Sequence, residues 1–362
     1  MIFLLDTDED ELAAMEPDDA ESLFTLLIDA DRCGRHFIVI KRAICGWALT
    51  NLKLSGQNQN HLNYLKEQYA TRGAIHKSAT SYIKLVFGDD PIIANDQYFQ
   101  IGHKVFIAGE FASSKTIMTV ENINADSKLY EFIFQVACKY TNVPNWSVEY
   151  ILGGGDTTAT AFEGEIEKNR VAICVVDTDR ISPCDKLGQT AKKVLKVDRK
   201  RNIVAVTPPK AYVGKAFETI GHELENYIPL IAIKQINCFT CPEGLDDYIS
   251  QETLKDSEDC LWQYFDIKNG VDGGNIVKKL NAGNKSQDVV DWIREKFGLS
   301  FDDFGKFKIQ GIGRSVTQHF LACVAAKEQY FAFSKTEYWK ALFLKHFEEI
   351  LWFLASSEAN RV

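Results

Sequence analysis

Residues 170–180, RVAICVVDTDR, contain the segment that decides the fold. Ala172 to Val176 is an unbroken run of five apolar residues, rich in β-branched side chains. A short run of this composition is typical of a strand that is buried on both faces, as in a parallel sheet. Asp177 and Asp179 follow the run directly. Because open parallel sheets bind their ligands outside the carboxyl ends of the strands, these two aspartates stand where ligand-binding residues are expected.

The segments around this strand predict a regular alternation of strands and helices. Further strands are expected at three places: Thr116 to Val120, Val148 to Leu152 and Asn202 to Val206. Helices are expected between the strands, through Leu129 to Ala137, Asp156 to Lys168 and Leu187 to Val197. The order β-α-β-α-β-α-β predicts a parallel sheet with right-handed crossovers.

The first 110 residues predict a separate α/β domain. We expect strands at Ile2 to Leu5, His36 to Ile44 and Gln100 to Ala108, and helices at Glu21 to Ala30 and Leu62 to Ala70. The first strand ends in Asp6, a start that resembles PIN-like nucleases. A solvated acidic turn is the simpler interpretation of that aspartate.

Helices dominate the sequence from about residue 237. They are expected at Thr253 to Tyr264, Asn275 to Asn281, Ser286 to Phe297, Val316 to Ala332 and Thr336 to Ala355. The predicted organisation is therefore an N-terminal α/β domain over residues 1–110, a parallel α/β domain over 111–236, and a mostly helical C-terminal region over 237–362.

The composition indicates a soluble, cytoplasmic protein. The chain of 362 residues is 46% hydrophobic and 25% charged, values typical of globular proteins, and has a net charge of −9. There is no long apolar run of the length that a transmembrane helix needs, and the start, MIFLLDTDEDE, lacks a basic leader, so no membrane partner is expected. The nine cysteines are scattered, and Cys238 and Cys241 lack the second pair of a zinc site.

Residues 109–116, GEFASSKT, imitate a phosphate-binding loop. Ser114 replaces the second glycine, and a strand is expected after Lys115 where the motif requires a helix. We therefore expect this chain to have no ATPase site of its own.

Acidic residues and glycines follow three successive strands of the predicted parallel sheet. Glu121 and Asp126 follow the first strand, Gly153 to Gly155 the second, and Asp177 and Asp179 the third. Because parallel strands end at one edge of a sheet, the carboxylates are expected to meet there. Oxygen ligands without histidine favour Mg²⁺ or Mn²⁺. Asp126 is also a candidate N-cap of the following helix.

These motifs resemble the Toprim fold of topoisomerases, primases and nucleases of the overcoming-lysogenization-defect class. The resemblance covers about residues 115–230 and rests on Glu121 in TVENINADSKLY, on the glycines in YILGGGDTT and on DTD. Asn122 stands where the family usually has a glycine after the glutamate. The resemblance implies a Toprim-like parallel sheet flanked by helices and a metal-dependent site at Glu121, Asp177 and Asp179.

A second segment, GHELENYIP at residues 221–229, resembles the Glu-Asn-Tyr segment of a bacterial Toprim nuclease subgroup, the domain of unknown function numbered 4435. That subgroup is similar to effectors of anti-phage systems that pair a Toprim nuclease with a separate ATPase. The resemblance implies that Glu225, with Glu223, supplies ligands for a second metal ion. It also implies that Lys268 lies near the scissile phosphate as a catalytic residue.

One basic cluster stands out in an acidic chain. It follows the DTD segment and comprises Lys186, Lys192, Lys193, Lys196, Arg199, Lys200 and Arg201. All but the first are candidate contacts to a nucleic-acid backbone. A solvated helix face explains the cluster equally well.

Three hypotheses for function remain open at this point. The first is a metal-dependent nuclease in which Glu121 is catalytic. The second is a regulatory subunit, without activity of its own, that binds an ATPase through the apolar C-terminal helix. The third is a nuclease centre at Asp6. The sequence leaves open whether the substrate is DNA or RNA, and whether the chain forms homo-oligomers.

Overall fold

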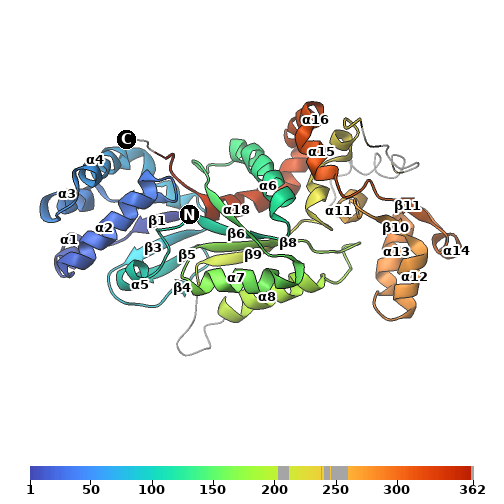
Figure 1. Cartoon of the computed structure of the whole chain (residues 1–362), viewed down its shortest axis with the longest axis horizontal. Coiled ribbons are helices and arrows are strands. Elements are labelled where there is room, and N and C mark those ends of the chain that lie inside the picture. Colours follow the sequence, from blue (N-terminus) through green and yellow to red (C-terminus); the bar gives the residue numbers. More distant parts are fainter. Residues whose placement is uncertain (203–211, 238, 240–244, 246–259, 360–362) are drawn as a thin grey trace.

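A computed structural model describes the whole chain except residues 203–211, 238, 240–244, 246–259 and 360–362 (Figure 1). The fold is mixed α/β, with two sheets of mainly parallel strands and helices on their faces. Figure 1 shows the first sheet at one end, the second sheet in the middle and a group of short helices at the other end.

The first sheet has the strand order β2-β1-β3-β5-β4. Its strands are β1 (Ile2–Leu5), β2 (Phe37–Ile40), β3 (Tyr82–Val86), β4 (Ile93–Ala94) and β5 (Tyr98–Gly102), and only β4 is antiparallel to its neighbour. Its helices are α1 (Glu9–Ala13), α2 (Pro17–Arg32), α3 (Arg42–Asn51), α4 (Gly56–Arg72) and α5 (His103–Ala108), together with the short turn η1 (Ile75–Lys77).

Two predicted strands of this part are too long. The strand expected at His36 to Ile44 ends at Ile40, and helix α3 begins at Arg42. The strand expected at Gln100 to Ala108 ends at Gly102, because His103–Ala108 is helical. In both cases apolar residues resume after two polar ones, Lys41-Arg42 and His103-Lys104, and short apolar segments alone do not distinguish a strand from a buried helix.

The second sheet has four parallel strands in the order β7-β6-β8-β9. These are β6 (Thr116–Val120), β7 (Val148–Leu152), β8 (Ala172–Val176) and β9 (Gly214–Glu218). Every residue of β6 and of β8 is buried, as the apolar run at Ala172–Val176 predicts.

The fourth strand of the described sheet is β9. Of the strand predicted at Asn202 to Val206, Asn202 ends helix α8 (Gln189–Asn202) and residues 203–206 lie outside the described residues. The sequence of β9, GKAFE, contains a glycine and two charged residues and so lacks a strong strand signal. Gly214 is required there, because a Cβ would lie 1.9 Å from the carbonyl oxygen of Ala172 on β8.

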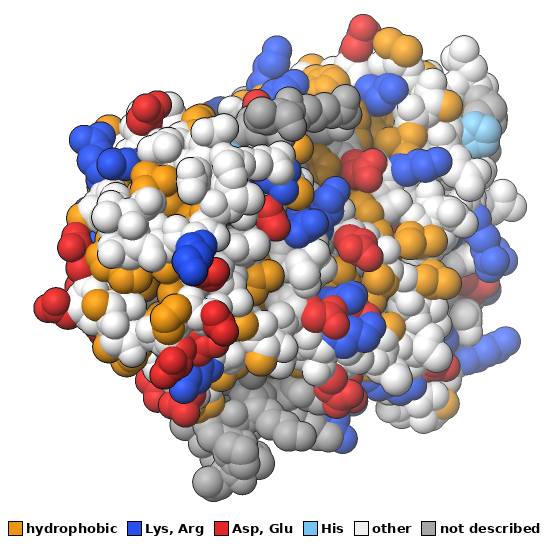
Figure 2. All heavy atoms as spheres, turned by 60° about the vertical axis from the view of Figure 1, so that its left-hand side comes forward, with side chains coloured by type: hydrophobic (Ala, Val, Ile, Leu, Met, Phe, Trp, Pro, Cys, Tyr) orange, Lys and Arg blue, Asp and Glu red, His pale blue; other side chains and the backbone are white. Residues whose placement is uncertain are grey.

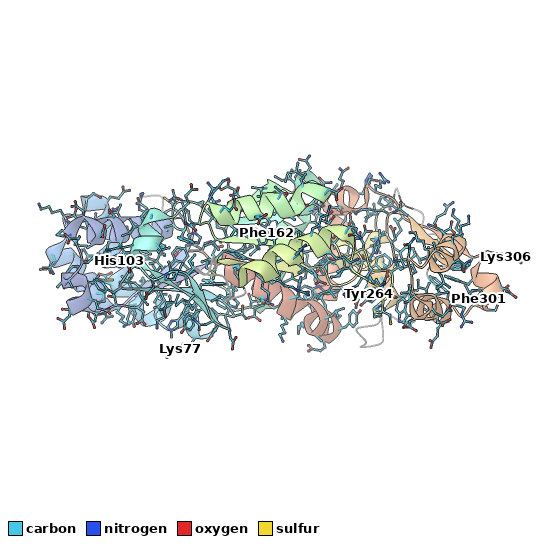
Figure 3. The ribbon with its side chains drawn as sticks, turned by 90° about the horizontal axis from the view of Figure 1, so that it is seen from below. Lys77, His103, Phe162, Tyr264, Phe301 and Lys306 are labelled. Atoms are coloured by element: carbon cyan, nitrogen blue, oxygen red, sulfur yellow. The ribbon has the colours of Figure 1, made fainter. Side chains whose placement is uncertain are left out.

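Helices cover both faces of the second sheet. Helices α7 (Thr158–Glu167) and α8 (Gln189–Asn202) lie side by side on one face, where Phe162 is buried (Figure 3). Helix α6 (Ile123–Ala137) lies on the opposite face together with α18 (Lys345–Leu354) (Figure 1).

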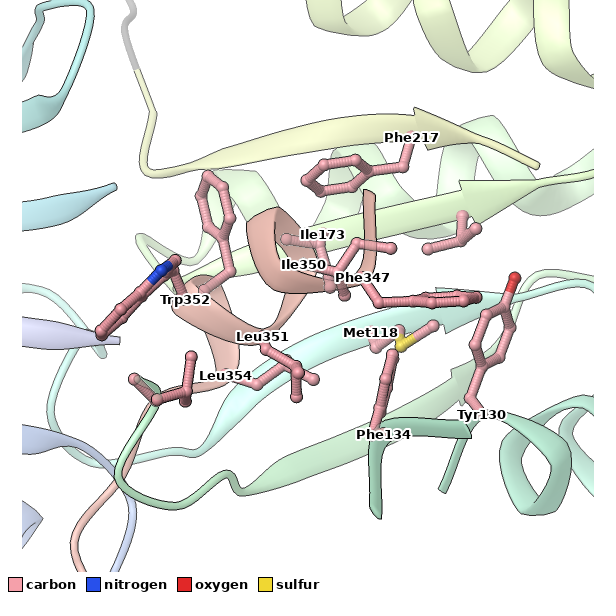
Figure 4. Close-up of a cluster of buried hydrophobic side chains, with 14 of the residues drawn as sticks. Met118, Tyr130, Phe134, Ile173, Phe217, Phe347, Ile350, Leu351, Trp352 and Leu354 are labelled. Atoms are coloured by element: carbon pink, nitrogen blue, oxygen red, sulfur yellow. The ribbon is translucent and has the colours of Figure 1, made fainter. Parts of the chain in front are cut away.

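Helix α18 packs into the core although it belongs to the predicted C-terminal region. Its side chains Phe347, Ile350 and Leu351 lie against the second sheet, near Met118 and Ile173 (Figure 4). The same helix also reaches the first sheet: the ring of Phe353 lies 6.2 Å from that of Phe99 on β5 and 5.9 Å from that of Phe217 on β9. The last helix thus joins the cores of the two sheets.

The described residues between β9 and α18 form short helices and one two-stranded sheet, and the first of the α-helices precedes residue 237. The helices are α9 (Leu230–Ile233), α11 (Leu261–Tyr264), α12 (Gly273–Asn281), α13 (Gln287–Lys296), α14 (Phe301–Phe304), α15 (Val316–Ala322), α16 (Val324–Ser334) and α17 (Glu337–Trp339), and α17 continues through Lys340–Leu344 into α18. The strands β10 (Gly270–Asp272) and β11 (Lys308–Gln310) pair antiparallel. The helix predicted over Val316 to Ala332 is interrupted, because Cys323 has an extended backbone and separates α15 from α16.

Among the described residues, no helix is long and apolar enough to cross a membrane.

Candidate metal centre

A crevice of about 440 Å³ opens at the carboxyl edge of the second sheet. Its lining combines acidic and basic side chains: Glu121, Asp177, Asp179, Ile181, His222, Glu223, Asp266, Lys268, Asn269, Lys279 and Lys285. Four of the six residues predicted as metal ligands are in this set. The predicted catalytic lysine, Lys268, is there as well.

The acids at the strand ends are neighbours because β6 and β8 are neighbours. Glu121 follows β6 and Asp177 follows β8, and the two strands pair directly. Asp177 is partly buried, and its Oδ1 accepts a hydrogen bond from the backbone N–H of Leu224 at 2.9 Å. A hydrogen bond from the Asp177 backbone reaches the carboxylate of Glu121. The two carboxylates therefore share one part of the crevice.

A tight turn directs Asp179 into the same crevice. Its φ of 55° is in the left-handed region, which aspartate tolerates better than most residues. The backbone N–H of Asp179 donates to the carbonyl oxygen of His222 at 3.0 Å. Gly188 faces the Asp179 side chain, and a Cβ at that position would lie 2.0 Å from Oδ2. The turn is thus fixed from both sides.

The segment after β9 carries Glu223 and Glu225 to the site. The backbone N–H of Glu223 donates to Oδ1 of Asn226 at 2.9 Å, and Nδ2 of Asn226 donates to the carbonyl oxygens of Trp262 and Phe265. The hydroxyl of Tyr227 accepts a hydrogen bond from the backbone N–H of Ile220 at 2.9 Å. The Asn and Tyr of the Glu-Asn-Tyr segment therefore hold the loop that presents the acids.

Lys268 lies among these carboxylates. Its Nζ is 2.8 Å from Oε2 of Glu223 and 3.1 Å from Oε2 of Glu225. Although burial lowers the pKa of Lys268, the charges of Glu225 and Glu223 raise it above its ordinary value, so the ammonium form is favoured. The lysine comes from the loop between α11 and β10, more than forty residues after the acids with which it pairs.

The carboxylates outnumber the cations that balance them. Burial raises the pKa of Asp177 well above its ordinary value, and the charges of Glu121 and Glu225 add to the effect. Burial, and then the charge of Asp179, raises the pKa of Glu121; burial, and then Glu225, raises that of Glu223. These acids resist ionisation together unless additional positive charge reaches them.

Asp126 and Glu225 are not part of the crevice lining. Asp126 is in the first turn of α6, and its Oδ2 accepts a hydrogen bond from the backbone N–H of Asn122 at 2.8 Å. Asn122, not Asp126, is the N-cap, so that prediction is wrong by one helical turn. Burial raises the pKa of Asp126 to about 7, with a contribution from Glu225.

Six residues of the crevice lining were not assigned a role from the sequence, and four of these are titratable: His222, Asp266, Lys279 and Lys285. Donor atoms of His222, Glu223 and Asp266 all lie within 4.8 Å of one another, close enough to bind one metal ion. Burial lowers the pKa of His222, but its hydrogen bond with Asp266 raises it overall. The closeness of Asp266 to Lys268 in the sequence was the one signal that could have found it.

The glycine turn after β7 lies at the same sheet edge but outside the crevice lining. Gly154 and Gly155 have φ of 72° and 59°, so the turn requires glycine for its conformation. A Cβ on Gly153 would lie 2.5 Å from Oγ1 of Thr158, at the start of α7. The close turn into α7 therefore explains the three glycines.

The predicted basic cluster lies along α8 and is not part of the crevice lining. Lys192, Lys193, Lys196 and Arg199 are exposed on that helix, and Lys193 pairs with Asp156 at 2.7 Å. The side chains of Lys200 and Arg201 lie outside the described residues. Asp198 accepts a hydrogen bond from the backbone N–H of Ala216 on β9, so the end of α8 that carries Arg199 runs back along the sheet, away from the carboxyl edge.

Comparison of the chain with models of protein families, with curated proteins and with solved structures finds no match.

Proposed function

We propose that this chain is a metal-dependent nuclease of the Toprim class that hydrolyses phosphodiester bonds of nucleic acid. The observation that carries the proposal is the unbalanced charge of the crevice. Five carboxylates line the crevice against three lysines, and one of these, Lys285, pairs with Asp185 outside the lining. Lys268 pairs with the buried acids Glu223 and Glu225. Acids after the first and third strands of a four-stranded parallel sheet are also what the resemblance to the Toprim fold implies.

The residues of the crevice fit a hard divalent cation. Most of the donors are carboxylate oxygens, the ligands that Mg²⁺ and Mn²⁺ prefer. Burial, and then the charges of neighbouring acids, raise the pKa values of Glu121, Asp177 and Glu223, so a bound cation would favour their ionised forms. Glu121, Asp177 and Asp179 would hold one ion, and Glu223 with Glu225 a second. Bound ions of this kind supply an activated water and stabilise the leaving oxygen of a phosphodiester.

The remaining side chains of the crevice suit a phosphate. The ammonium group of Lys268 can offset negative charge that develops on a phosphate oxygen. His222 has a raised pKa, which favours its protonated form, so it fits as a hydrogen-bond donor rather than as a base. Lys279 is exposed at the rim and can contact a neighbouring phosphate.

The test is a cleavage assay on plasmid DNA and on total RNA, with Mg²⁺ and with Mn²⁺. The wild type should cleave at least one of the two substrates, and Glu121→Ala should abolish cleavage without changing the thermal unfolding curve by more than a few degrees. Wild-type protein that cleaves neither substrate with either ion would contradict the proposal.

We also propose, on the resemblance alone, a role in anti-phage defence under the control of a separate ATPase. The regulatory alternative, a subunit without activity of its own, makes the opposite prediction in the cleavage assay. It predicts an inactive purified chain that forms a stable complex with an ATPase.

A further inference from the structure

A second cavity adjoins the crevice and has a different character. Its volume is about 290 Å³. Ile181, Asp266, Asn269 and Lys279 line both cavities, so the two cavities are neighbours. A group next to a ligand in the crevice therefore lies beside the second cavity.

The walls of the second cavity are mostly apolar. Leu261, Val271, Ile276 and Ile293 contribute aliphatic surface, and Tyr264 contributes an aromatic ring. The ring of Tyr264 is held by Trp292 on α13, with centroids 5.4 Å apart in an edge-to-face arrangement. Figure 3 shows Tyr264 where the second sheet's helices meet the group of short C-terminal helices. The cavity thus contains a positioned aromatic ring among aliphatic walls.

The polar groups of this cavity disfavour an anion. Asp266 and Asp272 contribute carboxylates, and Asn275 contributes an exposed side-chain amide. Among the described lining residues, the one cation is Lys279, which lies at the junction with the crevice. A neutral, flat group that carries N–H donors suits such a cavity, and a phosphate does not.

We propose that this cavity, the base pocket, takes one unpaired nucleobase from the nucleotide next to the phosphate that binds in the crevice. This inference rests on the proposed nuclease function and adds its substrate class. A cavity of about 290 Å³ is at the small end of ligand sites and suits a single base rather than a base pair. Single-stranded nucleic acid is therefore the substrate class, with Tyr264 as the stacking platform and Lys279 at the phosphate.

The base pocket is tested by binding and by cleavage. The probes are a short fluorescent single strand, the same strand annealed to its complement, and the same strand with one abasic position placed next to the cleaved bond. Binding is measured by anisotropy in Ca²⁺, and cleavage in Mg²⁺ and Mn²⁺. We expect the wild type to bind the intact single strand about tenfold more tightly than the duplex or the abasic strand, because stacking of one base on an aromatic residue contributes about that factor.

Variants of Tyr264 test whether its ring causes the preference for an unpaired base. Tyr264→Ala should weaken binding of the intact strand about tenfold and leave duplex binding unchanged, which also reports an intact fold. Tyr264→Phe should stay within about twofold of wild type, because the ring face remains. Phe301→Ala is the matched control, since Phe301 is an aromatic residue 44% exposed on α14, outside the lining of both cavities.

The two proposals fail in different ways. Equal binding of intact, abasic and paired probes by the wild type would overturn the base pocket, even if all three are cleaved. Selective binding that depends on Tyr264, without cleavage of any probe, would support the base pocket and overturn the nuclease.

Discussion

The two parallel sheets of this chain both place an aspartate directly after a central strand, yet the two sites differ in charge balance. In the first sheet, Asp6 follows β1 and pairs with Lys84 at 2.8 Å and with Lys41 at 3.1 Å. The hydrogen bond to Lys84 is the main reason why the pKa of Asp6 is below its ordinary value. In the second sheet, Asp177 follows β8, and burial among other acids raises its pKa well above that value.

This difference shows why a strand that ends in aspartate is a weak indicator of function. The site at Asp6 is neutralised by the side chains of its own sheet, and basic and acidic groups are interspersed over the face at that end of the molecule (Figure 2). The crevice of the second sheet has several acids around Lys268, so a bound cation would stabilise their ionised forms. The hypothesis of a nuclease centre at Asp6 therefore lacks the feature that supports the other site.

The largest expected effect is on cleavage by Asp177→Asn. Asparagine keeps an acceptor for the backbone N–H of Leu224 but removes the charge, so cleavage should fall on the order of 10³-fold. The same variant should unfold at a higher temperature without metal, because an ionised acid with a raised pKa destabilises the fold at neutral pH.

Asp6→Asn is the matched substitution in the first sheet. It should leave cleavage within about twofold and cost less than about 1 kcal/mol of stability, as is typical of partly exposed ion pairs. A large loss of cleavage in Asp6→Asn, with Asp177→Asn still active, would show that the active centre is in the first sheet and not in the second.

The second effect concerns the lysine that the acids share. Lys268→Met removes the ammonium group next to Glu223 and Glu225 and should reduce cleavage about 100-fold. It should also lower the melting temperature at neutral pH in EDTA, because two buried carboxylates lose their cation. Lys84→Met is the matched control. It should change the melting temperature less, since Lys41 still pairs with Asp6. It should leave cleavage unchanged, because Lys84 lies in the first sheet.

Added Mg²⁺ separates a structural role of Lys268 from a catalytic one. If the lysine only balances charge, the ion should restore both the melting temperature and cleavage of Lys268→Met. If the lysine contacts the phosphate, the ion should restore the melting temperature alone, which is the outcome we expect.

The sequence predicted the strands that have a strong local pattern of apolar residues. The buried strand at Ala172–Val176, the strands at Thr116–Val120 and Val148–Leu152, and the acids that follow two of them are where they were expected. The sequence did not predict β9, whose residues Gly214–Glu218 are held in the sheet by their neighbours rather than by their own propensity.

Residues of the crevice that the sequence did not indicate are brought there by contacts between distant parts of the chain. Asp266 and Lys268 reach the crevice through a loop that Asn226 holds by two backbone carbonyls, and Lys285 pairs with Asp185 100 residues earlier. Such contacts leave no periodic signal in the sequence. The basic cluster on α8 was open to two interpretations, a nucleic-acid contact or a solvated helix face, and its residues lie outside the crevice lining.

A third test uses the opposite pKa shifts of two aspartates. Folding raises the pKa of Asp126 from 3.8 to about 7, so the folded state holds its proton over a pH range in which the unfolded state has lost it. The free energy of unfolding therefore falls as the pH rises from about 4 to 7. Asp126→Asn should remove that loss and gain on the order of 2 kcal/mol over wild type across this range, by denaturant titration in EDTA.

Asp6→Asn should show the opposite sign in the same titrations. The lowered pKa of Asp6 means that its stabilisation is present above its unfolded pKa and is lost as the pH falls through the folded one. The variant should thus be slightly less stable than wild type at neutral pH and equal to it in acid. Parallel curves for the two variants would mean that the two sheet edges do not differ in charge balance.

The smallest expected effect compares a lysine at the crevice with an arginine of the basic cluster. Lys279 is exposed and lines both cavities, whereas Arg199 lies seven residues after Lys192 on α8, roughly 10 Å further along the helix axis. Lys279→Ala should lower the affinity for a single strand a few-fold and reduce the slope of log affinity against log salt by about 0.7, the loss of one phosphate contact. Arg199→Ala should leave that slope unchanged. If Arg199→Ala reduces the slope and Lys279→Ala does not, the nucleic acid follows α8 and the cluster predicted from the sequence is the true contact surface.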